Sequence, residues 1–298
     1  GKGAWRYARF ILLFSLAVET IGALLLMPAF CSRFGARGLW YAVFHSVSAY
    51  CNAGFDLMGA ETGRFSSLTA FVGSPLVNFT ICGLILSGGL GFSVWGDIGR
   101  NKFRLKKYSV QSKAVLLFGA LLVFIPSLYF YFAEFSSAAW KAELSGGERA
   151  LASFFQTVTP RTAGFNTVDY SKMSEASLLV TIALMLIGGA SGSTAGGMKI
   201  TTMAVLFCAA IAAVRKRREV RCFGRRISSD TVKDAATIAF LYVTLFFAGS
   251  VAISSIEKLP VVDCMFETAS AIATVGLTTG ITAGLSAASH IILIALMY

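Results

Sequence analysis

The chain has 298 residues, of which 56% are hydrophobic and only 14% charged, and its formal net charge is +11. A soluble domain uses about a quarter of its residues for charge, so this chain has too little polar surface to cover a water-soluble fold of its size. The composition excludes a soluble globular domain and a disordered chain, and it predicts an all-α integral membrane protein.

Five apolar stretches are long enough to cross a membrane, since one helical crossing needs about 20 residues. They cover residues 8–30, 70–96, 112–133, 176–214 and 233–256. A sixth apolar stretch begins near Ala287 and is still too short to cross at Tyr298. We therefore expect a multi-pass membrane protein whose last span is truncated.

Three basic clusters lie beside these stretches, at residues 1–9, 97–113 and 199–234. They hold 18 of the 26 Lys and Arg residues but only 4 of the 15 Asp and Glu residues. This asymmetry is typical of the positive-inside rule, so we predict that the clusters face the cytoplasm of a cell-membrane protein. Basic residues spread over three loops do not form a nucleic-acid-binding stripe, and we expect no nucleic-acid partner.

Between the spans lie three semi-apolar segments, Leu39–Gly59, Gly147–Asp169 and Val261–Gly280. Each is too short for a span plus a loop, and each is predicted to form a helix of about three turns followed by an extended stretch. This is a re-entrant design, which is stable at membrane depth only where protein or water surrounds it. The charge asymmetry places all three segments on the outer side.

The three segments are copies of one pattern, which align without gaps over residues 44–55, 154–165 and 266–277. Their shared glycines, Gly54, Gly164 and Gly276, are 110 and 112 residues apart. A span precedes each copy and another span follows it, so the repeated unit is span, re-entrant helix, strand and span. We predict three pore repeats, at residues 1–100, 101–220 and 221–298.

The repeated segment has the chemistry of a cation site. A helix whose C-terminus points into the membrane places about half a negative charge there, and a glycine after it frees the backbone to present carbonyl oxygens to a desolvated ion. The candidate ion-binding residues are Asn52, Ala53, Gly54 and Phe55; Thr162, Ala163, Gly164 and Phe165; and Thr274, Val275, Gly276 and Leu277. None of them is acidic, which argues against a divalent-cation site and for a monovalent cation.

The fourth apolar stretch is interrupted by small residues at 188–197, where each glycine costs a helix about 1 kcal/mol relative to alanine. The candidate residues of this break are Gly188, Gly189, Ser191, Gly192, Ser193, Thr194, Gly196 and Gly197. It is not a phosphate-binding loop, because Met198 separates Gly197 from Lys199. Close helix packing and a flexible intramembrane loop both remain open from the composition.

Several polar residues lie near these segments, and their roles remain open. Arg161 either sets the electrostatics of the outer mouth or pairs with a nearby acid. His45 and Glu267 lie within the re-entrant helices, where each is expected to have a partner on burial. The six cysteines show no CxxC spacing and the chain has two histidines, so we expect no zinc site and no cofactor. There is also no evident nucleophile with a base, and we expect no enzymatic activity.

These motifs resemble the Trk/Ktr/HKT superfamily of potassium transporters, most closely the bacterial Ktr membrane subunit. The resemblance rests on Phe44–Leu57, Thr159–Asp169, Gly188–Thr202, Phe266–Thr282 and the basic Phe223–Ile227, and it covers essentially the whole chain. It implies a potassium uptake subunit with four pseudo-repeats around one pore, K⁺ held at the filter residues listed above, and Na⁺ co-transported or required.

The same resemblance implies a gating loop at 188–197 that blocks the pore until it is displaced. It also implies a homodimer, and a cytosolic ring of nucleotide-binding regulatory subunits. The basic cluster at 215–226 offers a docking surface for such a partner or for anionic membrane lipid. The three repeats found would be the second, third and fourth of the family's four, so we expect the chain to be a fragment.

Three other functions compete with potassium uptake. A secondary transporter for a small solute would use the glycine-rich break as a broken-helix site, but that design predicts inverted repeats, whereas these repeats are parallel. An intramembrane hydrolase lacks an evident nucleophile–base or paired-carboxylate site. A scaffold would not need the glycine-ended segments.

Overall fold

The longest apolar runs fold into helices that extend through the whole molecule. The structure is a computed structural model that describes residues 2–298 apart from 103 and 218. Three helices are each long and apolar enough to span a membrane: α1 (Lys2–Phe34), α5 (Val110–Tyr129), which continues as a π-helical turn over Phe130–Glu134, and α10 (Ser229–Glu257). They confirm three of the predicted spans.

The other apolar runs are interrupted. Helices α3 (Pro75–Gly89) and α4 (Phe92–Asn101) meet at an angle of 94°, so the apolar stretch predicted at 70–96 is a bent helix pair, which is long and apolar enough for one span when the two helices are taken together. The bend falls at Gly91, which has a φ of 83° that a residue with a Cβ rarely adopts. The predicted break of the fourth stretch is confirmed, because α8 (Glu175–Leu186) and α9 (Ile200–Val214) are separated by an irregular segment.

Three shorter helices confirm the predicted helix-then-extended segments. These are α2 (Arg37–Tyr50), α7 (Gly146–Val158) and α11 (Val261–Ile272), and each is followed by irregular backbone. The start of α7 is fixed by a capping box, in which Ser145 and Glu148 satisfy each other's backbone N–H groups. The last helix, α12 (Ala287–Leu296), packs against α10 and α11.

The remaining elements are short connections. A small helix, α6 (Ala138–Glu143), precedes α7, and an antiparallel hairpin of β1 (Arg221–Cys222) and β2 (Arg225–Arg226) joins α9 to α10. The sequence did not predict this hairpin. Single 3₁₀ turns lie at Met58–Ala60, Thr69–Phe71, Leu105–Lys107, Tyr170–Lys172 and Thr282–Gly284.

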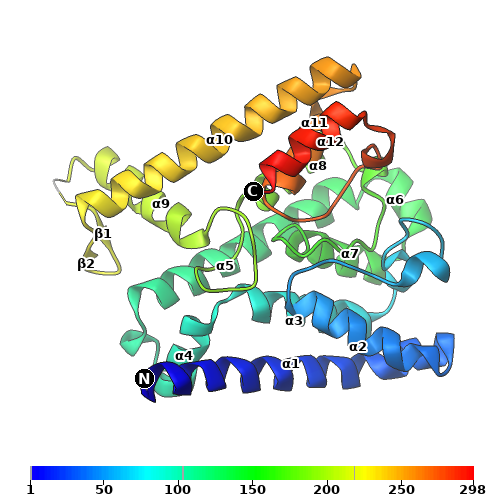
Figure 1. The fold of residues 1–298 in the computed structure, drawn as a ribbon, viewed down its shortest axis with the longest axis horizontal. Coiled ribbons are helices and arrows are strands. Elements are labelled where there is room, and N and C mark those ends of the chain that lie inside the picture. Colours follow the sequence, from blue (N-terminus) through cyan, green and yellow to red (C-terminus); the bar gives the residue numbers. More distant parts are fainter. Residues whose placement is uncertain (1, 103, 218) are drawn as a thin grey trace.

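The long helices frame the molecule and the short ones lie inside the frame. In Figure 1, α1 runs along one edge and α10 crosses the opposite edge, while α2, α7 and α11 occupy one half of the length between them. The N-terminus, α4 and the β1–β2 hairpin share one end, and α6 lies toward the other. Helix α2 packs on α1 and α11 packs on α10, so each short helix is held by the long helix before it.

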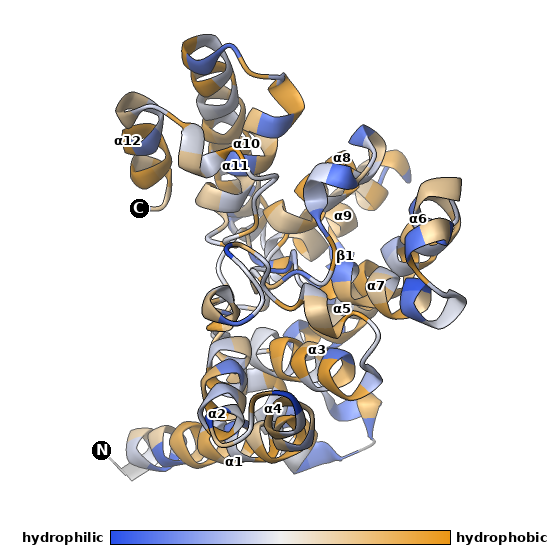
Figure 2. Ribbon diagram, turned by 90° about the vertical axis from the view of Figure 1, so that its right-hand side faces the viewer, coloured by the Kyte–Doolittle hydropathy of each residue, from blue (hydrophilic) through white to orange (hydrophobic). Residues whose placement is uncertain are grey.

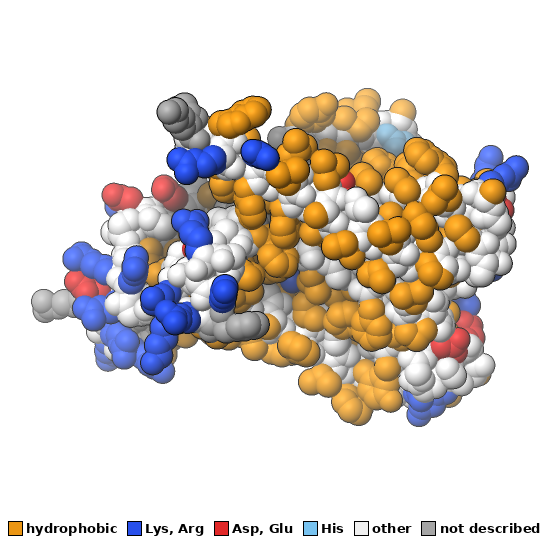
Figure 3. Space-filling view, turned by 90° about the horizontal axis from the view of Figure 1, so that it is seen from below, with side chains coloured by type: hydrophobic (Ala, Val, Ile, Leu, Met, Phe, Trp, Pro, Cys, Tyr) orange, Lys and Arg blue, Asp and Glu red, His pale blue; other side chains and the backbone are white. Residues whose placement is uncertain are grey.

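The surface is that of a membrane protein. Figure 3 shows a broad hydrophobic band between two charged ends, of which the end with the N-terminus, α4 and the hairpin is the more basic. Large apolar side chains are exposed along the spanning helices, including Leu12, Phe124, Phe132, Phe240 and Val251, and the helices are apolar along most of their length (Figure 2). An exposed apolar surface of this extent needs lipid or protein to cover it, so the fold is all-α and integral to a membrane.

Candidate functional site

Three irregular segments meet in the middle of the molecule, and we call them the glycine strands: residues 51–57, 161–168 and 273–280. Their glycines approach so closely that side chains are excluded. A Cβ on Gly54 would overlap the carbonyl oxygen of Ala163, and a Cβ on Gly164 would overlap that of Val275 and lie 3.2 Å from the Cα of Gly54. The second glycine strand therefore lies between the first and the third.

The glycine strands share one unusual backbone conformation. The three glycines have φ values of 72°, 88° and 90°, and the residues two positions earlier, Asn52, Thr162 and Thr274, have φ values of 51°, 68° and 54°. The residue between each pair has an ordinary negative φ. Positive φ is rare for any residue with a Cβ and rarest for a β-branched one such as threonine, so the same strained conformation in three places points to function.

Each strand is fastened to the helix turn immediately before it. The residue preceding each glycine donates its N–H to a carbonyl oxygen of that turn, on Ser48, Thr159 and Ser270, at 2.8–3.0 Å. The hydroxyl groups of these residues bond the strand again, by donating to the carbonyls of Phe55 and Phe165 and accepting from the N–H of Gly276. These local bonds hold the strained backbone in place.

The electrostatics of the meeting point favour a cation. The C-terminal ends of α2, α7 and α11 all lead into it, and each brings about half a negative charge. The twelve residues around the glycines include no carboxylate. Among the described residues, no group of three or more His, Cys, Asp and Glu side chains is placed to hold a metal ion. Backbone carbonyls are the available ligands, and such ligands suit a desolvated monovalent cation.

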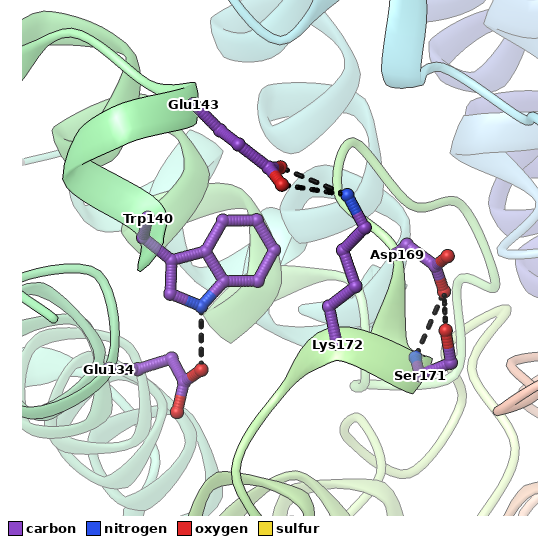
Figure 4. A network of polar contacts seen from close by, with 6 residues as sticks. All are labelled: Glu134, Trp140, Glu143, Asp169, Ser171 and Lys172. Atoms are coloured by element: carbon purple, nitrogen blue, oxygen red, sulfur yellow. Dashed lines mark hydrogen bonds and ion pairs between the residues drawn. The ribbon is translucent and has the colours of Figure 1, made fainter. Parts of the chain in front are cut away.

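An open cavity of about 670 Å³ leads from the less basic end of the molecule to all three glycines. It is lined by charged side chains of both signs: Asp56, Arg64, Glu143, Asp169 and Lys172. Figure 4 shows the polar contacts on one wall, where Lys172 lies 2.9 Å from Glu143. The pKa of Lys172 is raised, chiefly by its hydrogen bond to Glu143. In the same view Ser171 donates to Asp169, and Trp140 donates to Glu134 at 2.8 Å.

The opposite side of the glycine strands is covered by residues 187–199, which we call the intramembrane loop. Thr194 Oγ1 donates to the carbonyl oxygen of Tyr50 at 2.9 Å, and the N–H of Gly196 donates to Thr162 Oγ1 at 3.1 Å. A Cβ on Gly196 would overlap Thr274 Oγ1 and lie 2.7 Å from the carbonyl oxygen of Ala273. The loop therefore contacts all three repeats on the side of the glycine strands away from the 670 Å³ cavity.

The loop is anchored in the bend between α3 and α4. Ala190 and Thr194 donate their N–H groups to the carbonyls of Gly89 and Gly88, at 2.9 and 3.3 Å. The N–H of Phe92, the first residue of α4, donates to the carbonyl of Gly192 at 3.1 Å. The carbonyl groups of Gly88 and Gly89 at the bend thus accept hydrogen bonds from the loop.

The arrangement of the glycine strands is open on one side. A groove of about 470 Å³ separates the first strand from the third and is lined by residues of both, including Ala53, Thr274 and Gly276. Phe55, which follows the first glycine, is 71% exposed, whereas its counterparts Phe165 and Leu277 are buried. The second strand is enclosed on both flanks, and the outer two each have one flank facing the groove.

Arg161 lies where neither expectation placed it. Its side chain is buried and lines a small pocket with Leu86 and Gly189, away from the outer cavity. Within the described part of the chain no carboxylate lies within ion-pair distance of it. Both the outer-mouth and the acid-pair interpretations are therefore wrong.

Comparison with known proteins identifies what the chain resembles. A family model described as TrkH, a cation transport protein, matches residues 6–298. The chain is 38% identical to a potassium/sodium uptake protein, NtpJ, of Enterococcus hirae over 100% of this chain and 65% of that one. It is 37% identical to the Ktr system potassium uptake protein B of Bacillus subtilis over 97% of this chain and 63% of that one.

The fold is also found in a solved structure. The potassium transporter TrkH from Vibrio parahaemolyticus superimposes with a TM-score of 0.75, at 20% identity, over 97% of this chain and 60% of that one. The chain thus spans slightly less than two thirds of the length of these relatives.

Proposed function

Because the chain belongs to the TrkH family of cation transport proteins, we propose that it is the pore-forming membrane part of a potassium uptake system. The observation that carries this proposal is the backbone of the glycine strands, in which three repeats adopt the same strained alternation and bring Gly54, Gly164 and Gly276 together. Relatives named for the uptake of potassium, or of potassium and sodium, support K⁺ as the transported ion and Na⁺ as the second.

In this proposal the glycine strands are the selectivity filter. The ion loses its hydration shell and is held by the carbonyl oxygens of the strands, which the helix C-termini make more negative. Our proposed filter residues are the twelve predicted ones, from Asn52 to Phe55, Thr162 to Phe165 and Thr274 to Leu277. The groove beside Phe55 and Gly276 is the position that a fourth strand of the same kind would take, and the greater length of the relatives supports this. Residues 1–100, 101–220 and 221–298 would then be the second to fourth pore repeats.

We assign gating to the intramembrane loop. Its contacts with Tyr50, Thr162 and Thr274 support this role, because a loop across the inner end of the proposed filter would stop an ion. The residues that would move are those predicted from the sequence, between Gly188 and Gly197. They are held by polar contacts to other segments, so displacement of the loop would not require the spanning helices to unfold.

The charge distribution supports an orientation and a class of partner. The more basic end of the molecule, with the hairpin at Arg221–Arg226, would face the cytoplasm under the positive-inside rule. There it would meet anionic lipid and a ring of nucleotide-binding regulatory subunits, and two copies of the transporter would pair as a homodimer. The outer cavity would then collect K⁺ from outside the cell.

The proposal is tested with the full-length gene in a bacterium that lacks potassium uptake. Growth on low K⁺ is measured for the wild type and for Gly164→Asp, and membrane levels are measured for both. We expect rescue by the wild type and loss of rescue with Gly164→Asp at normal membrane levels. Failure of a well-expressed wild type, supplied with its regulatory partner, would refute potassium uptake and favour the small-solute transporter.

A further inference from the structure

The three re-entrant helices carry different residues at one equivalent position. Counting back nine residues from each shared glycine gives His45, Phe155 and Glu267. All three side chains are buried, at 0%, 0% and 4% exposure. A buried imidazole and a buried carboxylate are costly unless they are hydrogen-bonded, so this position must have a role beyond packing in two of the three repeats.

Glu267 ties its helix to the outward part of the third glycine strand. One carboxylate oxygen accepts from Thr278 Oγ1, and the other accepts from Thr282 Oγ1 at 2.7 Å. Thr278 Oγ1 in turn accepts the N–H of Gly280 at 2.8 Å. These donors lie two to six residues beyond Gly276, so a single carboxylate holds the backbone that leaves the ion-binding segment.

His45 makes a weaker version of the same tie. Its Nδ1 lies 2.7 Å from the carbonyl oxygen of Tyr41, which fixes the ring, and its Nε2 accepts from the N–H of Leu57 at 3.5 Å. Leu57 is three residues beyond Gly54. The same helix position is thus hydrogen-bonded to the backbone or side chains beyond the glycine in two repeats, by an imidazole in one and a carboxylate in the other. This recurrence indicates that the link between the helix and the outgoing strand matters.

In the second repeat, a contact with a neighbouring loop takes the place of the hydrogen bond from the helix to its own strand. Phe155 is apolar, and the outgoing strand beyond Gly164 is instead held by the loop that follows the first repeat's strand. The N–H of Leu68 donates to the carbonyl of Asn166 at 3.0 Å, and the N–H of Asn166 donates to Ser67 Oγ at 3.2 Å. A strand that has no such outer loop against it depends on its own helix.

The third strand is connected to its own helix by Glu267. Gly276 and Thr274 face the groove, and Glu267 lines the same groove. Among the described residues, the one heavy atom within 4 Å of a Cβ on Gly276 would be the Cα of Gly164, at 3.9 Å. The carboxylate of Glu267 lies behind this strand and, through its hydrogen bonds to Thr278 and Thr282, determines where the backbone beyond Gly276 lies.

We propose that Glu267 is a positioning residue for ion selection, which holds the third glycine strand at the separation that suits K⁺. The inference rests on the proposed function, since it assigns the strand to the ion path. It predicts that weakening the tie changes the affinity for the ion, whereas loss of a merely structural contact would change the amount of folded protein.

Glu267→Gln tests this directly, with Glu134→Gln as the matched control. Glu134 is equally buried, at 4% exposure, and accepts hydrogen bonds from Trp140 and Ser174, but it lines neither the outer cavity nor the groove. Uptake kinetics of the full-length transporter give KM for K⁺, inhibition by Na⁺, and Vmax per membrane protein. We expect Glu267→Gln to raise KM about tenfold, as for the loss of one charge-assisted hydrogen bond, and to increase inhibition by Na⁺. Glu134→Gln should leave KM unchanged.

A wild-type KM for Glu267→Gln would overturn the inference, provided that the wild type transports K⁺; no transport by the wild type would instead overturn the proposed function. If Glu267→Gln does not reach the membrane, the inference is tested by comparing the KM values of Thr282→Val and Thr282→Ser. The valine removes one donor to the carboxylate and should raise KM about threefold, whereas the serine keeps the hydroxyl and should restore it. Equal KM values for the two variants would likewise overturn the inference.

Discussion

The glycine strands and the intramembrane loop are both glycine-rich and irregular, yet the bonds that attach them to the rest of the molecule differ around the strained glycines. The strands bond to the helix turn just before them, as Ala53 does to Ser48 and Val275 to Ser270. The loop bonds to residues far away in the chain, such as Tyr50 and Gly89. Irregular backbone is stable in a membrane only when such partners exist, but near and distant partners have different consequences.

Local partners make a segment rigid, and distant partners make it releasable. A glycine strand cannot leave its bonds without unwinding the last turn of its own helix, so its strained φ values persist. The loop's bonds cross interfaces between separate elements, so they break together when the loop moves as one unit. A rigid segment beside a releasable one is the arrangement that the proposed filter and gate would need.

The largest effect should come from adding a methyl group to a strand. In Gly164→Ala the new Cβ would overlap the carbonyl oxygen of Val275, at a residue whose φ is 88°. The carbonyl group of Val275 would have to move, and we expect K⁺ uptake to fall about a hundredfold, which corresponds to roughly 2.7 kcal/mol. The measurement is initial-rate uptake per membrane protein.

The matched control for this change is Gly83→Ala. Gly83 lies within α3, and no heavy atom lies within 4 Å of a Cβ built on it. Alanine in a helix interior is favourable relative to glycine, so uptake should stay at the wild-type level. Normal uptake by Gly164→Ala would break the comparison, because the strand would then be as adaptable as the loop.

A smaller effect of opposite sign should follow from loosening the loop. Thr194→Val removes the hydrogen bond to the carbonyl of Tyr50 but keeps the side-chain shape. One hydrogen bond contributes about 1 kcal/mol, so the displaced state should become about fivefold more populated. Uptake measured in cells without the regulatory subunits should therefore rise.

Thr244→Val is the control for the loop variant. Thr244 Oγ1 donates to the carbonyl of Phe240 at 2.7 Å on the exposed face of α10, so the chemical change is the same but the loop is untouched. Uptake without the regulatory subunits should not change. A fall in uptake with Thr194→Val would show that the loop supports the strands rather than blocking them.

The sequence predicts the segments well and their contacts poorly. Run length, glycine content and charge gave the long helices, the re-entrant helices and the break at 188–197, because each depends on residues close together in the chain. The bend at Gly91, the buried position of Arg161 and the tie from Glu267 to Thr282 depend on which segments approach one another. No spacing within the sequence encodes those distances, so they were missed or wrongly expected.

The smallest effect should come from the ion pair at the outer cavity. Lys172 and Glu143 join the outgoing part of the second strand to α6, but their side chains are 52% and 51% exposed. Exposed pairs contribute little to stability, and if the strands are held by local bonds, Lys172→Met should change uptake by less than about twofold. The control is Lys141→Met on α6, because Lys141 forms no ion pair among the described residues.

The pH dependence sharpens this last test. Glu143 raises the pKa of Lys172, so the lysine stays charged throughout the physiological range, and the contribution of the lysine's charge is lost as pH rises through that elevated pKa. The ratio of variant to wild-type uptake should therefore be the same at about pH 6 and pH 8, well below the lysine pKa. A large fall in uptake with Lys172→Met at both values would mean that the local bonds of the second strand do not suffice to hold it, and the distinction between rigid and releasable segments would then fail for this strand.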